Sequence, residues 1–461
     1  MRPLEETLYL PSNPRPLSAQ RVQELLSSER NKYRELTAQS SELYLNSKEI
    51  MPLGVPSSFQ YWEPYALGVK SASGAYLIDM DGRECLDLSM GFGALQIGHS
   101  NPILTNELIK IMNNGILYVS PSSLTQMAAK VITERFNIDM VRFTNSGTES
   151  IMYAIRLAKV YTKRNGLIKI EGGYHGGYDS SNVSTKPDLK LAGDSKSPNS
   201  VFAPGIEPGD VVVIPYNDIQ ALQELLEKNP DRFAALLIEP VLENIAIALP
   251  DENYLKEIRQ LTKKHKVLLI LDEIKTGLTA GPKGASHIYQ VEPDIITLAK
   301  SIGGGVAVGA FGGKRDILSL IQTGHAPHFG TYNGNPLAMQ AVITVNDILT
   351  TEVIRSSQAL NARTLSNANS IIQNYQLPAH LVGFGTKGCI TWSPTQVRNY
   401  RDYKNTDFQM AELHWLWNIN RGIITPPGLD EQWLVSIAHS DTDMNKMITT
   451  FQDLAKSLRM Y

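Results

Sequence analysis

Two short apolar segments, each followed at once by a charged residue, constrain the fold of this 461-residue chain most strongly. The run 267–271 precedes Asp272, and the run 295–299 precedes Lys300. Continuous aliphatic and β-branched runs of this length are typical of buried parallel strands, whose carboxyl ends open onto ligand sites. A carboxylate and an amine are therefore expected at one edge of a parallel sheet, although any α/β protein has unrelated polar residues at strand ends.

The region from about 100 to 340 repeats a pattern of apolar run, loop and helix. Helical patterns such as 150–163 and 218–228 lie between the apolar runs. The predicted strands are Val141–Phe143, Ile168–Ile170, Val211–Ile214, Ala235–Ile238, Val267–Leu271, Ile295–Leu298 and Ala307–Phe311. This alternation predicts an α/β fold with a mostly parallel seven-stranded sheet that has helices on both faces.

The N-terminal region has a different pattern. Residues 1–16 are rich in proline and weakly patterned, so we expect a loose arm. Apolar residues at near-helical spacing predict one or two helices over 18–45. The Asp-Gly turn at 81–82 separates two alternating runs within 74–88, which is a strong signal of a β-hairpin.

These patterns predict three sections along the chain. Residues 1–95 would form the arm and part of a small domain, 96–344 a large domain, and 345–461 the rest of a small α+β domain. A long irregular segment, 179–210, lies in the large domain, and a loop of that length is usually functional or disordered.

Composition narrows the possible partners. A net charge of −3 and a pI near 6.3 give no support to nucleic-acid or membrane-surface binding. The two cysteines, Cys85 and Cys389, are far apart, so neither a disulfide framework nor a metal cluster is indicated. Without a signal-peptide pattern or an apolar run of about 20 residues, a cytoplasmic location is expected.

Three turn-rich segments are candidates for ligand binding. Residues 145–149 (Asn-Ser-Gly-Thr-Glu) lie between a strand and a helix, where backbone N–H groups and hydroxyls suit a phosphate, although a plain N-cap has the same composition. In 172–177 an aromatic among glycines could stack on a flat ring, whereas His175 alone is more often structural. Thr331 in 330–336 could donate to a phosphate or be a turn hydroxyl without a ligand.

These motifs occur in an order that resembles the class III (subgroup II) aminotransferases of pyridoxal phosphate (PLP) fold type I, and among them the glutamate-1-semialdehyde 2,1-aminomutases. The resemblance runs from about residue 50 to the C-terminus. Its motifs are Gly147-Thr148-Glu149, Tyr174-His175-Gly176, Pro215-Tyr216-Asn217-Asp218, Ile238-Glu239-Pro240-Val241, Leu271-Asp272-Glu273-Ile274-Lys275-Thr276-Gly277, Lys300 before three glycines, Gly334-Asn335-Pro336 and Ala438-His439-Ser440.

The resemblance implies a PLP site and a role for each matching residue. Lys300 would form the Schiff base with the cofactor and shuttle the proton, and Asp272 would pair with the pyridine nitrogen. The remaining residues would surround the cofactor: Tyr174 and Ile274 on the two ring faces, Ser146, Gly147 and Thr148 at the phosphate, Glu239 and Asn244 near the ring hydroxyl, and Thr331 at the phosphate of the neighbouring subunit. The last role implies a homodimer with shared active sites.

One departure bears on the substrate. The aminomutases carry an arginine for the substrate carboxylate at a position that aligns with Gln60, and an amide cannot form a bidentate ion pair. Phe59, Tyr61 and Trp62 indicate an apolar mouth or ordinary core aromatics. We therefore expect an aminotransferase acting on a β-amino acid, an apolar amine or a carrier-bound ketone. The alternatives are an aminomutase or epimerase of this fold and a catalytically silent relative, which the intact Lys300 and Asp272 argue against.

Overall fold

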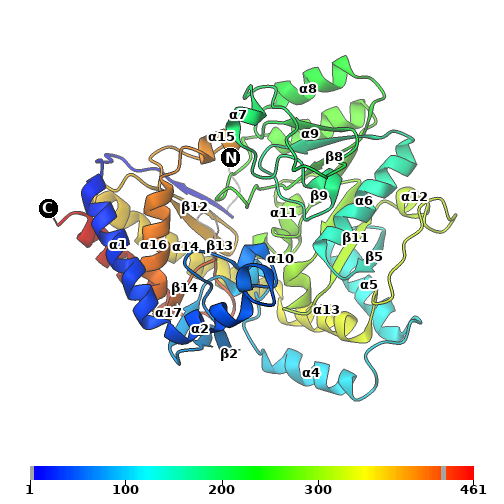
Figure 1. Cartoon of the computed structure of the whole chain (residues 1–461). Coiled ribbons are helices and arrows are strands. Elements are labelled where there is room, and N and C mark those ends of the chain that lie inside the picture. Colours follow the sequence, from blue (N-terminus) through cyan, green and yellow to red (C-terminus); the bar gives the residue numbers. More distant parts are fainter. Residues whose placement is uncertain (1–4, 427–431, 461) are drawn as a thin grey trace. The chain divides into compact units, whose positions relative to one another are not determined.

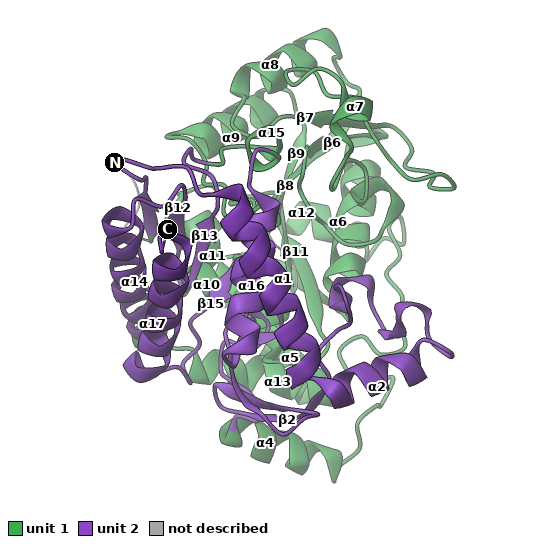
Figure 2. Ribbon diagram, turned by 60° about the vertical axis from the view of Figure 1, so that its left-hand side comes forward, with its two compact units in different colours: residues 1–5, 102–354, 397–404 green, residues 6–101, 355–396, 405–461 purple. Residues whose placement is uncertain are grey.

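The computed structural model describes residues 5–426 and 432–460, and the chain divides into two compact units (Figure 2). Unit 1 is formed mainly by residues 102–354 and 397–404. Unit 2 is formed by residues 6–101, 355–396 and 405–461.

Unit 1 is built around the predicted seven-stranded sheet, in the order β5-β11-β10-β9-β8-β6-β7. Neighbouring strands are parallel except at β11, which is antiparallel to both β10 and β5. The strands are β5 (Met140–Thr144), β6 (Gly166–Ile170), β7 (Val211–Ile214), β8 (Phe233–Ile238), β9 (Leu268–Asp272), β10 (Ile295–Leu298) and β11 (Gly309–Gly313), as seen in part in Figure 1. The predicted α/β fold is confirmed.

Helices cover this sheet, and their apolar faces explain where they pack. In α6, Ile151 and Ile155 are buried in one cluster with Leu237 of β8 and Ile270 of β9. Burying an aliphatic side chain of this size contributes roughly 1.5–3 kcal/mol. The helices of unit 1 are α4 (Pro102–Met112), α5 (Ser123–Phe136), α6 (Gly147–Thr162), α7 (Leu189–Ala192), α8 (Ile219–Lys228), α9 (Tyr254–Lys264), α10 (Gly277–Ala280), α11 (Gly284–Ile288), α12 (Arg315–Leu318) and α13 (Pro336–Ile348).

A short segment from late in the sequence, Val397–Lys404, belongs to unit 1 and contains helix α15 (Tyr400–Tyr403). Arg401 donates two hydrogen bonds to the buried Glu171, at 2.9 and 2.8 Å. The ring of Tyr400 packs where a Cβ on Gly172 would lie, and its hydroxyl donates to the carbonyl of Pro187 at 2.7 Å. This segment therefore holds the loop that follows β6.

Unit 2 contains two four-stranded sheets and a core rich in aromatic side chains. One sheet has the order β1-β12-β13-β15 and the other β14-β4-β3-β2. The strands are β1 (Glu6–Tyr9), β2 (Val69–Ser73), β3 (Tyr76–Asp79), β4 (Glu84–Asp87), β12 (His380–Phe384), β13 (Lys387–Thr391), β14 (Ile423–Ile424) and β15 (Trp433–Leu434). The predicted hairpin is present as β3 and β4, which pair antiparallel.

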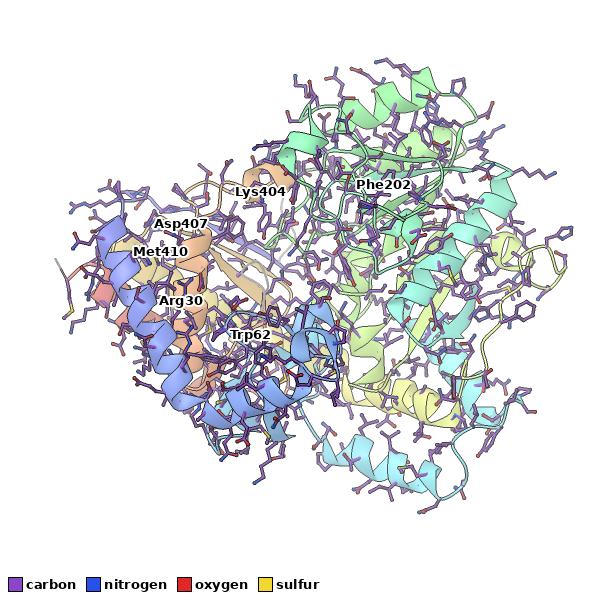
Figure 3. All side chains as sticks on the ribbon, in the orientation of Figure 1. Arg30, Trp62, Phe202, Lys404, Asp407 and Met410 are labelled. Atoms are coloured by element: carbon purple, nitrogen blue, oxygen red, sulfur yellow. The ribbon has the colours of Figure 1, made fainter. Side chains whose placement is uncertain are left out.

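The helices of unit 2 include the two predicted near the N-terminus. They are α1 (Ala19–Leu36), α2 (Ala38–Ser47), α3 (Met90–Gly93), α16 (Phe408–Asn420) and α17 (Asp441–Leu458), and α14 (Thr351–Asn374) crosses the boundary between the units. Arg30 of α1, labelled in Figure 3, donates to Glu412 of α16 at 2.8 Å. In α3 the backbone is left-handed, with a φ of 45° at Met90 and 56° at Phe92.

The expectation of a loose arm over residues 1–16 is wrong for residues 6–9, because β1 pairs antiparallel with β12, whereas residues 10–16 form no helix or strand. Residues 1–4 lie outside the described residues. Within the described ranges, no single helix is long and apolar enough to cross a membrane, and α13 and α14, bent by 70°, meet that test only as a pair.

Candidate functional site

The carboxyl edge of the unit 1 sheet gathers most of the predicted site residues. Thr297 of β10 is the register partner of Asp272 at the end of β9, so Lys300 leaves the sheet beside that carboxylate. Glu239 follows β8 directly, and Tyr174 lies in the loop after β6. The fold therefore brings these residues close together, because the carboxyl ends of parallel strands lie at the same edge of the sheet.

Asp272 is 3% exposed and accepts three hydrogen bonds. Its Oδ1 accepts from the backbone N–H of Ile274 at 3.0 Å and from the hydroxyl of Thr297 at 3.2 Å. Its Oδ2 is 2.7 Å from Nδ1 of His175. Burial lowers the pKa of His175 more than the neighbouring carboxylate raises it, so the ring is neutral and Nδ1–H donates to Asp272. These three donors are all neutral.

Glu239 and Asn244, in the segment that follows β8, form a second cluster of polar side chains. The amide of Asn244 donates to both carboxylate oxygens of Glu239, at 3.2 and 3.1 Å. Oε1 of Glu239 also accepts from the backbone N–H of Tyr174 at 3.1 Å. Burial, and then the nearby charge of Asp272, raise the pKa of Glu239 to about 7. The structure thus brings Glu239, Asn244 and Tyr174 into one hydrogen-bonded set.

The turn between β5 and α6 has the geometry of an anion site. Ser146 is the N-cap of α6, and its hydroxyl accepts from the backbone N–H of Glu149 at 3.2 Å. A Cβ on Gly147 would lie 2.6 Å from Cδ1 of Ile274, so a larger residue there would displace the side chain of Ile274. Gly177 donates its N–H to the hydroxyl of Thr148 at 3.3 Å. The first turn of a 16-residue helix leaves backbone N–H groups that can bind an anion.

The predicted site residues fall into two groups that differ in burial. Ser146, Thr148, Tyr174, Ile274 and Lys300 are half-buried, whereas Asp272, His175, Glu239 and Asn244 are buried. Lys300 also has a φ of 49°, in the left-handed region. For a residue other than glycine that conformation costs about 1 kcal/mol or more, and such strain is often found at functional sites.

Thr331 lies apart from this group and is exposed. With 117–121, Thr125 and 333–336, it lines a cavity of about 280 Å³. The same loop does reach the anion turn, because Oδ1 of Asn333 accepts from the side chain of Asn145 at 2.9 Å. The predicted contact of Thr331 with a neighbouring subunit is not tested by a single chain.

Sequence reasoning missed two residues that the structure adds to the site. His175 was recognised only as part of a motif, and Thr297 only as part of a strand, yet both donate to Asp272. Thr297 could have been recognised as the one polar residue of the apolar strand β10, since a buried hydroxyl needs a hydrogen-bond partner. The hydrogen bond between His175 and Asp272 joins the loop after β6 to the end of β9, and nothing in the sequence indicates it.

The segment with the substituted arginine position lies in unit 2. Gln60 is exposed at the end of a 3-10 turn, Ser58–Gln60. Phe59 is 41% exposed, and its ring is 6.2 Å from that of Phe92. Trp62, labelled in Figure 3, is partly buried and packs edge-on against Trp415 of the unit 2 core, with ring centroids 5.0 Å apart. Of these aromatics, Trp62 thus covers the core of unit 2, whereas Phe59 lies on the surface.

Comparisons with known proteins give a consistent result. A family model described as aminotransferase class-III matches residues 60–412. A glutamate-1-semialdehyde 2,1-aminomutase of Methanocella arvoryzae is 34% identical over 415 residues, which cover 89% of this chain and 96% of the relative.

Two solved structures are also similar. An omega-transaminase from Sphaerobacter thermophilus is 29% identical with a TM-score of 0.88, and the match covers 93% of this chain and 100% of the other. A β-phenylalanine aminotransferase from Variovorax paradoxus is 26% identical with a TM-score of 0.83, and the match covers 94% and 97%.

Proposed function

This chain belongs to the class III aminotransferase family of PLP-dependent enzymes, and we propose that it moves an amino group between carbon atoms at the carboxyl edge of the unit 1 sheet. The observation that carries the proposal is that a buried carboxylate, Asp272, and a lysine, Lys300, lie at the carboxyl ends of two adjacent parallel strands, β9 and β10.

The residues at this edge fit PLP. Asp272 is a buried carboxylate whose three hydrogen-bond donors described above are neutral, so a protonated pyridine nitrogen would be a favourable positively charged partner for it. The first turn of α6, with Ser146, Gly147 and Thr148, offers donors for the phosphate group. Half-buried Tyr174 and Ile274 would cover the two ring faces, and Glu239 with Asn244 would lie near the ring hydroxyl.

When bound, PLP supplies an aldehyde that takes up amines and a protonated ring that withdraws electrons from the substrate's α-carbon. The protein supplies the rest. Lys300 Nζ would hold the cofactor and carry a proton to and from the α-carbon. Asp272 keeps the ring nitrogen protonated, and the neutral His175 fixes the orientation of that carboxylate.

Two finer functions are candidates. The name of the archaeal relative supports an aminomutase at least as well as it supports any other activity. The names of the two solved structures support a transaminase, and so does Gln60, which cannot replace an arginine as a partner for a substrate carboxylate. An aminomutase would act on one substrate, whereas a transaminase would consume a donor and an acceptor.

A substrate comparison separates these candidates. The PLP-loaded protein is incubated with glutamate-1-semialdehyde alone, and separately with a β-amino acid and a keto acid, and the products are identified by mass spectrometry. Formation of 5-aminolevulinate from the first supports the aminomutase; amino transfer in the second supports the transaminase. Gln60→Arg should favour small carboxylate substrates. If no amine changes the absorbance of the bound cofactor, the proposal is wrong.

We also propose that the enzyme is a homodimer. Ten large apolar side chains of unit 1 are exposed on α4, on the segment that follows it, on α5 and on the loop 329–332, and we propose that they form one apolar patch: Ile103, Ile109, Met112, Ile116, Leu117, Tyr118, Val119, Met127, Phe329 and Tyr332. Exposed apolar patches of this kind often mark protein interfaces. The patch includes Tyr332, the neighbour of Thr331. If a second copy of the chain binds to this patch, the hydroxyl of Thr331 lies at the interface, where it could reach the other subunit's phosphate site.

A further inference from the structure

A fully buried lysine of unit 1, Lys169, has no part in the roles described above. It lies on β6, in a strand whose residues are all buried, and it is 0% exposed. Its Nζ donates to the carbonyl oxygen of Gly173 at 2.5 Å, and the carbonyl of Ile170 is 3.4 Å away. A buried ammonium is costly unless strong acceptors surround it, so this position requires an explanation.

Both the carbonyl and the N–H of the peptide group that Lys169 contacts form hydrogen bonds to buried side chains. The carbonyl of Gly173 and the N–H of Tyr174 belong to the same peptide, and that N–H donates to Oε1 of Glu239 at 3.1 Å. One peptide group is thus placed between a buried lysine and a buried carboxylate. Burial lowers the pKa of Lys169 to about 7, while the charges of Glu239 and Glu171 oppose that shift. Charge-assisted hydrogen bonds of this kind are about twice as strong as neutral ones.

The clamped peptide leads directly into the two residues that serve the site. Tyr174 would cover the ring of PLP, and His175 donates to Asp272. Gly173 is fixed closely, because a Cβ there would be 3.1 Å from Nε2 of His175 and 3.3 Å from the carbonyl of Ile170. A shift of this peptide would therefore move Tyr174 and His175 together.

We propose that Lys169 is a positioning residue, which with Glu239 clamps the Gly173–Tyr174 peptide and thereby sets the places of Tyr174 and His175. The part that concerns PLP rests on the proposed function. The clamp itself belongs to the protein without cofactor, so the two can be tested separately.

Amide hydrogen exchange on the cofactor-free protein tests the clamp. Fragmentation mass spectrometry resolves the amide of Tyr174 in the wild type, Lys169→Met and Lys169→Gln. Lys387→Met is the matched control, since Lys387 is a buried lysine of unit 2. We expect the Tyr174 amide to exchange about tenfold faster or more in Lys169→Met, less so in Lys169→Gln, which keeps a neutral donor, and unchanged in the control.

Titration with PLP then tests the consequence for the site. We expect Lys169→Met to bind PLP with a Kd within about threefold of the wild type, because the anion turn is intact, but to show a weaker visible circular dichroism band, because Tyr174 is displaced. Unchanged exchange at Tyr174 in the folded variants would overturn the clamp, and if Lys169→Met does not fold, Lys169→Gln alone decides. A wild type with a protected Tyr174 amide that binds no PLP would overturn the proposed function and leave the clamp standing.

Discussion

At the scale of single residues, the arrangement around Asp272 explains how a carboxylate can be kept ready for a cation. Three neutral donors orient both of its oxygens, yet none of them neutralises its charge. A buried negative charge without a counter-charge is unfavourable, so this site should bind a positively charged ring more tightly than a neutral one.

Asp272→Asn should lower the rate at which an amino donor discharges the bound cofactor by about 100-fold or more, because the ring nitrogen loses its anionic partner. The rate is followed by absorbance in single-turnover mixing. Asp294→Asn is the control, since Asp294 is a buried aspartate at the amino end of β10, away from the site, and its rate per folded molecule should match the wild type. A rate within a few fold of wild type for Asp272→Asn would remove this residue from the mechanism.

Lys300→Ala should abolish the covalent link to PLP. The purified variant should lack the visible absorbance of the wild type, and borohydride treatment of the wild type should leave the cofactor's mass on Lys300. Lys314→Ala is a suitable control, because Lys314 is engaged in an ion pair with Asp294 at 2.8 Å. Peptide mapping that found the label on Lys275 or Lys314 would refute the assignment.

The residues that could be predicted from sequence are those at strand ends, because an apolar run followed by one charge is a local signal. Lys169 could not be predicted in the same way. Its strand reads as an ordinary apolar run with one charged residue, and the groups that make its burial tolerable, at Gly173 and Glu239, lie in other segments. Whether a charged residue can be buried at such a position depends on tertiary contacts, and these cannot be inferred from one sequence.

At the scale of elements, the amino ends of β9 and β10 are held by a cluster opposite to the site. Asp294 accepts from Arg259 of α9 at 2.6 and 2.9 Å, from Lys314 at 2.8 Å, and from the backbone N–H of Leu269 at 2.8 Å. Burial alone would raise the pKa of Asp294, but these hydrogen bonds together hold it below its usual value.

Asp294→Asn should therefore destabilise the cofactor-free protein by about 3 kcal/mol at pH 7. This is the lower end of the range for a broken buried ion pair, and we choose it because Arg259 and Lys314 are partly exposed to solvent. Because the pKa of Asp294 is lower in the folded protein than in the unfolded chain, its carboxylate stabilises the fold at pH values above the unfolded pKa, near 3.9. This stabilisation is lost as the pH falls through the pKa of the folded protein. The difference in free energy of unfolding between the two proteins should shrink from pH 7 to pH 3 in urea unfolding. An equal difference at every pH would contradict this role for Asp294.

Elements with local signals, such as the seven strands of unit 1 and the hairpin of β3 and β4, were predicted correctly. The strand β1 was not. Its partner β12 is more than 370 residues away in sequence, and the prolines around it read as irregular chain. Pairing over such a distance depends on the finished fold.

At the scale of the whole molecule, the apolar patch of unit 1 predicts the assembly. Phe329 is 76% exposed, so Phe329→Asp should disrupt association without a cost to the folded chain. Light scattering after size-exclusion chromatography should show a shift towards monomer, and PLP retention should fall. Ile50→Asp, at an 88% exposed residue of unit 2 outside the patch, is the matched control.

Thr331→Ala should leave the dimer intact and weaken PLP binding by about tenfold, the effect of one lost hydrogen bond to a charged group. An active monomer that retains its cofactor would contradict both the dimer and the role of Thr331.

The placement of Val397–Lys404 in unit 1, between two stretches of unit 2, has a consequence for how the protein is made. The chain passes between units after residues 5, 101, 354, 396 and 404. During synthesis from the N-terminus, the loop after β6 must wait for Tyr400 and Arg401 to leave the ribosome before it is secured. Neither unit can therefore be completed early, and a premature stop codon before residue 397 would leave both unfinished.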